Sequence, residues 1–122
     1  MDSTESLMAV ITANEYHNGL IAEFMGASFN DEGTARVCGR FGLETVSASD
    51  LEYHRSWDWL MRVVERIESD ERYDVDILQY GTRIIERTKT ESIEIVNNIA
   101  NISFDKKIEH TYQAVVEFVK QQ

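Results

Sequence analysis

The chain has 122 residues with 43% hydrophobic and 28% charged side chains, a composition typical of one globular domain and unlike that of a disordered chain. Twelve basic against 22 acidic residues give a formal net charge of −10, which disfavours direct binding to a nucleic-acid backbone. The single cysteine, Cys38, excludes an intrachain disulfide and a multi-cysteine metal site, and no apolar run reaches the length of a membrane span. We therefore expect a single domain over residues 1–122 that works in a cytoplasm, with no direct contact to nucleic acid or membrane.

The N-terminal part predicts one helix followed by short extended segments. Residues 1–13 fit an arm, a short strand or a helical lead, and the pattern does not choose between them. Over residues 14–25 apolar side chains recur at helical spacing, with Asn14 as the expected N-cap and Gly26 as the terminating glycine. Residues 27–49 contain turn signals and two β-like segments, ARVCGRF and LETVS.

The middle of the chain predicts a helix and then three strands. Ser56 is a suitable N-cap for a helix that runs to about Ser69. Helical spacing places Trp57 on its apolar stripe and leaves Trp59 partly exposed. Alternating apolar and polar residues then predict strands in RYDVDILQY, TRIIERT and SIEIV, the first two joined at Gly81.

The closing segment, FDKKIEHTYQAVVEFVKQQ, is typical of an amphipathic helix. Ser103 or Asp105 is the expected cap, and Lys120 is favourable near the negative end of the helix. The predicted apolar stripe consists of Ile108, Tyr112, Val115, Val116 and Val119.

This order of elements predicts an α+β fold, with a small antiparallel sheet of about three or more strands and helices packed on one face. A small sheet covered on one side leaves apolar surface, so we also expect a homo-oligomer.

The segment EYHRSWDWLMRVVERIES, residues 52–69, contains the candidate binding site. We expect its apolar ridge to be mainly core. The start of the helix is different, because free backbone amides there attract anions such as phosphate. Neighbouring aromatic rings would then hold a nucleobase and an arginine would supply positive charge. The predicted ligand-binding residues are Tyr53, His54, Arg55, Asp58, Trp59 and Arg62.

Simpler interpretations stand beside these. Asp58 would stabilise the positive end of the helix without any function, and Trp59 would equally suit the core or an oligomer contact. Three scattered histidines without an HxxxH pair do not predict a metal site, and we expect no cofactor. Cys38 is more typical of a small buried residue than of a nucleophile, and the chain lacks a glycine-rich phosphate loop. The sequence favours a binding protein over an enzyme without deciding the question.

Residues 65–76 contain six acids and two arginines. They suit a solvated helix end and the wet side of a strand. Alternatively, they form an acidic surface that mimics DNA and occupies a host protein.

Three segments carry a resemblance: NGLIAEFMG near the start, YHRSWDWLMRVVERIES in the middle and HTYQAVVEFVKQQ at the end. Together they resemble a family of small uncharacterised proteins of bacteriophages and prophages, especially those of Bacteroidota. The matches cover residues 16–26, 53–69 and 110–120, about a third of the chain, in the family's order. The family commonly has proline where this chain has Arg62, and arginine there is compatible with a helix. The resemblance implies a role in the cytoplasm of an infected bacterium but assigns no activity to particular residues.

The resulting hypothesis is a non-enzymatic phage accessory protein that counters host defence by binding. In the first form, it sequesters a small anionic, nucleotide-type immune signal of the host. In the alternative form, its acidic surface binds and inhibits a host defence protein.

Overall fold

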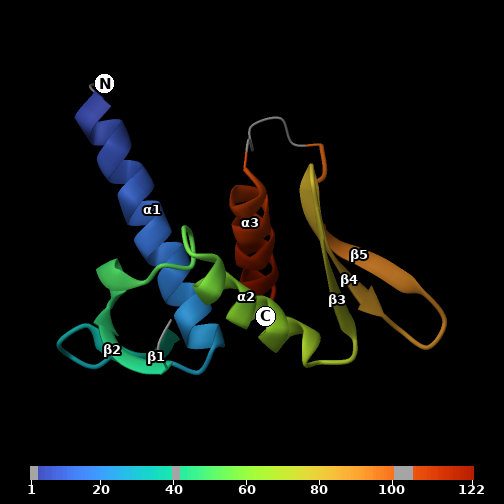
Figure 1. The fold of residues 1–122 in the computed structure, drawn as a ribbon, viewed down its shortest axis with the longest axis horizontal. Coiled ribbons are helices and arrows are strands. Elements are labelled where there is room, and N and C mark those ends of the chain that lie inside the picture. The colour runs from blue at the N-terminus through green and yellow to red at the C-terminus, as the bar shows by residue number, and fades with distance from the viewer. Residues whose placement is uncertain (1–2, 40–41, 101–105) are drawn as a thin grey trace.

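The computed structural model describes residues 3–39, 42–100 and 106–122, and Figure 1 shows their arrangement. Three α-helices and two antiparallel sheets make up these residues, which confirms the predicted α+β class. In chain order the elements are α1 (Ser3–Phe24), β1 (Thr34–Gly39), β2 (Gly42–Ser47), the 3₁₀ turn η1 (Ala48–Asp50), α2 (Trp57–Glu68), β3 (Tyr73–Leu78), β4 (Gly81–Arg87), β5 (Ser92–Asn97) and α3 (Lys107–Lys120).

The strands form two separate sheets and not one. A hairpin of β1 and β2 lies near α1 and α2, whereas β3, β4 and β5 form a meander in that order. In the meander Ile84 of β4 is fully buried and faces the helices, and the register pairs Asp76 with Arg83 across β3 and β4. The alternation predicted for these strands therefore places their charged residues on the side away from the core.

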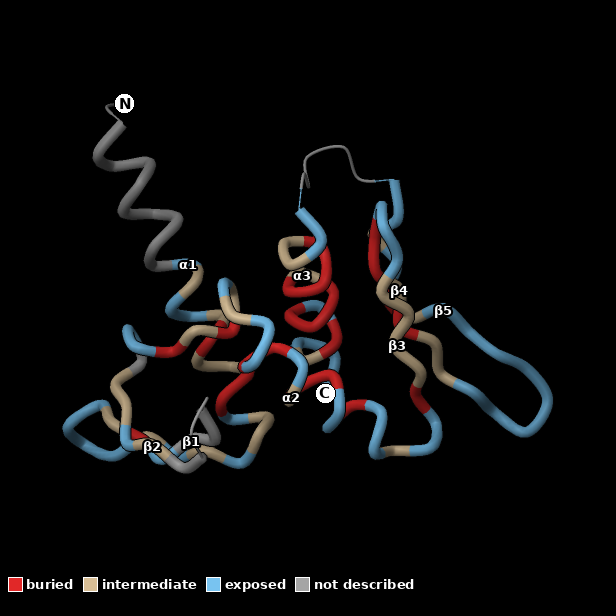
Figure 2. The backbone as a smooth tube through the Cα atoms, viewed as in Figure 1, coloured by how far each residue is buried: buried red, intermediate tan, exposed pale blue. Residues whose placement is uncertain are grey.

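Helix α3 occupies the centre of the molecule, with the three-stranded sheet on one side and α1 on the other, while α2 passes the lower end of α3 in this view and contacts both α3 and β3 (Figure 1). Most of its length is buried, as the red tube in Figure 2 shows. The predicted caps Ser103 and Asp105 lie outside the described residues, and the residue before the helix is Lys106. The buried residues of α3 are His110, Thr111, Tyr112, Ala114, Val115, Val116 and Phe118.

Helix α1 begins at Ser3, so residues 3–13 form the helical lead that was one of three open alternatives, and the helix does not start at residue 14 as expected. Asn14 lies inside the helix and caps nothing, because residues 3–13 already form its first turns. The predicted stop at Gly26 is confirmed. Gly26 has φ of 94°, and the N–H groups of Gly26 and Ala27 donate to the carbonyls of Glu23 and Ala22, the paired bonds of a Schellman motif.

Helix α2 confirms the predicted bounds and has Ser56 at its N-cap position, where the Ser56 side chain makes no capping hydrogen bond, and it corrects the predicted buried face. Trp59 is 3% exposed, whereas Trp57 is 38% exposed. The ring of Tyr53 packs edge to face on Trp59, with centroids 5.1 Å apart, and so draws that side of the first turn inward. The buried residues of α2 are Trp59, Leu60, Val63, Val64 and Ile67.

Candidate functional site

The structure separates the six residues predicted to bind a ligand. Tyr53 and Trp59 are buried together in the core, so their faces are not open to a nucleobase. Asp58 is exposed and Arg62 is half-buried along α2, and neither lines the pocket at the start of this helix. Only His54 and Arg55 of the predicted set meet at that pocket.

The pocket has a volume of about 210 Å³ and lies between α1 and the chain that leads into α2. We call it the α1–α2 pocket. One wall consists of side chains about one turn apart on α1, and the other wall consists of side chains from the segment after β2. Its lining residues are Asn14, Glu15, Asn18, Ser49, Leu51, His54 and Arg55.

Asn18 joins this pocket to the core through three hydrogen bonds. Its Nδ2 donates to the carbonyl of Leu51 over 3.2 Å and lies 2.9 Å from Nδ1 of His54. The hydroxyl of Tyr112 donates to its Oδ1 over 2.9 Å. Asn18 is only 2% exposed. Because both ends of its side-chain amide have buried partners, the amide is held in one orientation.

This network fixes the protonation of His54. The Leu51 carbonyl can only accept, so the atom of Asn18 that faces it and His54 must be the NH₂ group. Nδ1 of His54 must then accept, and the proton of the neutral ring lies on Nε2. His54 therefore enters the pocket wall as a neutral donor and not as a cation.

The groups around His54 also favour its neutral form. Partial burial lowers the pKa of His54, the positive charge of Arg55 lowers it further, and Glu52 opposes both. The Arg55 guanidinium donates to Glu52 over 2.7 Å, but its side chain remains 65% exposed and can turn toward a ligand. Burial also raises the pKa of the Tyr112 hydroxyl, which stays a donor to Asn18.

Sequence reasoning missed Asn18 and treated Tyr112 as apolar core only. One signal was present: Asn18 lies three and four positions before the buried residues Ile21 and Ala22, so it shares their helix face. A polar residue on such a face requires buried partners. Those partners come from residues 51, 54 and 112, which a local pattern does not identify.

A second buried polar cluster joins α3 to β4. Thr111 donates to the Lys107 carbonyl over 2.8 Å, so the Thr82 hydroxyl donates to Thr111 and accepts from Nδ1 of His110 over 2.7 Å. His110 is 2% exposed, and its Nε2 has no hydrogen-bond partner among the described residues. Nδ1 of His110 therefore donates, the opposite role to Nδ1 of His54, and its buried Nε2 has no partner in that part of the chain.

The acidic segment at residues 65–76 is partly neutralised. Asp70 pairs with Arg72 over 2.8 Å, Asp76 with Arg83 over 2.8 Å, and Asp74 with Arg87 over 2.6 Å. The bonds to Arg72 hold the pKa of Asp70 below its usual range. Half of the six acids in this segment are therefore bound to arginine on the outer side of the fold.

The described part of the chain has neither a metal-binding cluster nor a helix suited to a membrane. It contains no group of three or more His, Cys, Asp or Glu side chains that could hold a metal ion, and the side chain of Cys38 is outside it. Within the same part, no helix has both the length and the apolar character needed to cross a membrane.

Comparison with known proteins leaves the site to be judged on its geometry. No protein-family profile, no curated protein and no solved structure matches the chain.

Proposed function

We propose that the protein binds a small anionic molecule, with its phosphoryl or carboxylate group in the α1–α2 pocket. The observation that supports this most is the pairing of two donors at one pocket, a neutral His54 with its proton on Nε2 and the guanidinium of Arg55. Such donors suit an anion, because charge-assisted hydrogen bonds are the strong ones. A neutral imidazole also donates without the cost of burying a second positive charge.

The size of the pocket limits what enters it. About 210 Å³ is less than the roughly 300–1,000 Å³ of pockets that enclose a whole drug-sized ligand. A phosphoryl group with one adjoining ring fits that space. Because Tyr53 and Trp59 are in the core, any base of a nucleotide would lie at the mouth of the pocket and not between these rings.

Sequestration of a host immune signal in an infected bacterium remains our proposal for the purpose of this binding, and the resemblance of three segments to small phage proteins supports it. Native mass spectrometry of protein purified from phage-infected cells tests the purpose. We expect a small bound mass that leaves on denaturation. A bound host protein would instead favour the acidic-surface alternative, for which the arginine pairs of Asp70, Asp74 and Asp76 are unfavourable.

The binding itself is tested by NMR titration with inorganic phosphate, adenosine 5′-monophosphate and uncharged adenosine. We expect saturable shifts at residues 49–55 with the two anions and none with adenosine. Arg55→Gln should weaken binding about fivefold, because an exposed charge contributes up to about 1 kcal/mol. Glu15→Gln should strengthen it by removing a carboxylate from the pocket wall.

Arg72→Gln is the matched control. Arg72 is also an exposed arginine in a 2.8 Å pair with an acid, but it lies directly before β3 and does not line the pocket. Binding should be unchanged in this variant. Equal loss in both variants, or no saturation by either anion, would reject the proposed site.

A further inference from the structure

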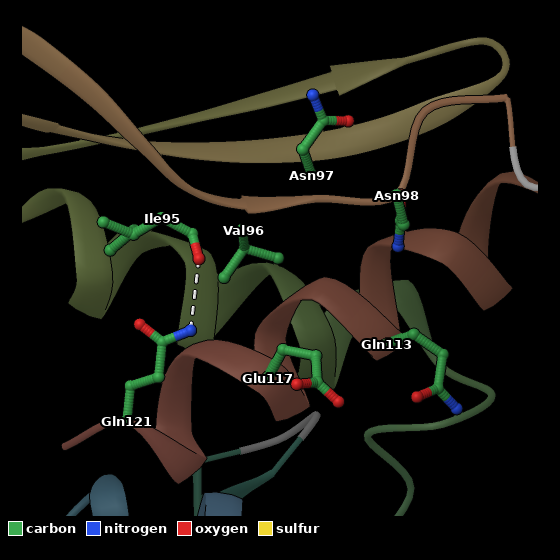
Figure 3. Close-up of a pocket in the computed structure, with 7 residues that line it drawn as sticks. All are labelled: Ile95, Val96, Asn97, Asn98, Gln113, Glu117 and Gln121. Atoms are coloured by element: carbon green, nitrogen blue, oxygen red, sulfur yellow. Dashed lines mark hydrogen bonds between the residues drawn. The ribbon is translucent and has the colours of Figure 1, made fainter.

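A larger cleft of about 380 Å³ lies between β5 and α3, on a part of the molecule that shares no lining residue with the α1–α2 pocket. Figure 3 shows strand residues along one side and helix residues along the other. Strand β5 is an outer strand of its sheet, with β4 on one side only. The lining residues are Ile95, Val96, Asn97, Asn98, Gln113, Glu117 and Gln121.

The two asparagines of this cleft support the fold. Asn98 donates to the His110 carbonyl over 2.7 Å and accepts from the Thr82 N–H over 2.7 Å. Asn97 donates to Glu94 over 2.9 Å and accepts from the Ile99 N–H over 2.9 Å. Both carboxamides are therefore occupied at each end and fix the strand side of the cleft.

The helix side is different. Gln113, Glu117 and Gln121 are spaced by four residues, so they form one row along α3. Among the described residues, the side chains of Gln113 and Glu117 have no hydrogen-bond or ion-pair partner. Gln121 uses only its Nε2, which donates to the Ile95 carbonyl over 3.1 Å (Figure 3).

The hydrogen bond from Gln121 shows that a backbone carbonyl of β5 is open to a donor from outside the sheet. The Ile95 carbonyl lies at a bulge, where the register between β4 and β5 shifts, and so it faces α3 and not β4. A flexible glutamine at the end of α3 occupies a position that a peptide N–H would take in an added strand. Ile95 and Val96 supply apolar contacts beside that position.

We propose that this cleft binds an extended peptide segment of a protein partner, which runs along β5 and places an arginine or lysine side chain on Glu117. Glu117 is the single charged residue in the lining; within the described chain its carboxylate forms no ion pair, and its charge acts on the nearby His17 ring. Together with the Gln113 and Gln121 carboxamides, it presents mainly acceptors. A partner with donors and positive charge complements this surface, and the net charge of −10 steers such a segment toward it. This inference is independent of the proposed anion binding.

The test is an NMR titration of the whole chain with the blocked tripeptide acetyl-Val-Arg-Val-amide. We expect saturable shifts at Ile95, Val96 and the Gln121 side chain. Replacing arginine by citrulline, which keeps the shape and removes the charge, should weaken binding at least fivefold. Glu117→Gln should do the same, whereas Glu65→Gln removes an exposed carboxylate on α2 and should have no effect.

Three outcomes would overturn the proposal. The first is no saturation with the arginine peptide, and the second is equal binding of the citrulline peptide. The third is equal binding of agmatine, which has the guanidinium without a peptide backbone and would point to a small amine as the ligand. Glu117 is exposed, so its substitution leaves the fold intact for these measurements.

Discussion

Asn18 and Thr82 are buried polar residues that each fix whether Nδ1 of a histidine donates or accepts a hydrogen bond. The NH₂ group of Asn18 must face the Leu51 carbonyl, which only accepts, and the Thr82 hydroxyl must donate to the Thr111 hydroxyl. Nδ1 of His54 therefore accepts, which leaves the ring proton on Nε2 of a residue that lines the α1–α2 pocket, whereas Nδ1 of His110 donates in the interior. The two rings have the same chemistry and different surroundings, and only the first is placed to meet a ligand.

Thr82→Val tests the buried cluster of α3 and β4. Valine keeps the shape but leaves Nδ1–H of His110 without an acceptor in the core, since Thr82 is fully buried. We expect the free energy of unfolding to fall by about 1–3 kcal/mol, the cost of an unsatisfied buried donor. Urea denaturation measures this loss.

Thr90→Val is the matched control, because Thr90 is exposed in the turn before β5. The expected change is within about 0.5 kcal/mol. A Thr82 variant as stable as this control would mean that the cluster contributes nothing to stability.

At the scale of the elements, the glycines of this chain have different roles. Gly19 lies inside α1 with open space around it, and Gly26 has the positive φ that ends this helix. Gly81 begins β4 against the backbone of Ile99, where an added Cβ would lie 2.7 Å from the Ile99 nitrogen. Alanine at these three positions should therefore have three different effects.

Gly19→Ala should stabilise the protein by about 0.5–1 kcal/mol, because alanine is the better helix former. Gly26→Ala should destabilise it by about 1 kcal/mol through backbone strain alone, since its surroundings are open. Gly81→Ala should cost at least about 2 kcal/mol through the clash with Ile99. Thermal denaturation of the three variants gives the order, and a neutral Gly81→Ala would contradict the close contact.

Local patterns predicted most of the elements, because capping residues and alternation act over a few positions. Ser56, Gly26 and the three strands of the meander came from such signals. The start of α1 was not predictable from Asn14, since a capping residue is also tolerated inside a helix that has already formed. The reversal of Trp57 and Trp59 depended on Tyr53, which precedes the helix and fills the core beside it.

The candidate site was predictable only in part, because a local pattern does not identify contacts between distant segments. His54 and Arg55 were expected at the start of α2, and they line the pocket. The other wall comes from α1, and the buried support comes from Tyr112, 94 residues from Asn18. Contacts at that separation follow from the tertiary fold and have no local signal.

At the scale of the whole molecule, histidine burial gives stability a dependence on pH. Burial lowers the pKa of His17 and of His54 below 6.5, with further lowering from Lys120 and Arg55 respectively, while Glu117 and Glu52 oppose these effects. The unfolded chain therefore binds more protons than the folded chain below about pH 6.5. This contribution to stability is complete above that pH and is lost as the pH falls through the folded-state values.

We therefore expect the free energy of unfolding to decrease as the pH falls from about 7.5 to about 5.5. The double variant His17→Gln/His54→Gln should show a smaller decrease over the same range, whatever its stability at neutral pH. Urea denaturation at several pH values measures both slopes. Identical slopes would show that neither histidine has a lowered pKa in the folded protein.

The most direct test of the binding site is the tautomer of His54, read at neutral pH from long-range ¹H–¹⁵N NMR correlations of the free protein. The hydrogen bonds of Asn18 predict a neutral ring with its proton on Nε2, and added inorganic phosphate should shift the Nε2 signal. The variant Asn18→Ala assigns the effect, because it should release this tautomer preference. A charged ring, or a proton on Nδ1, would contradict the donor arrangement on which the proposed anion binding rests.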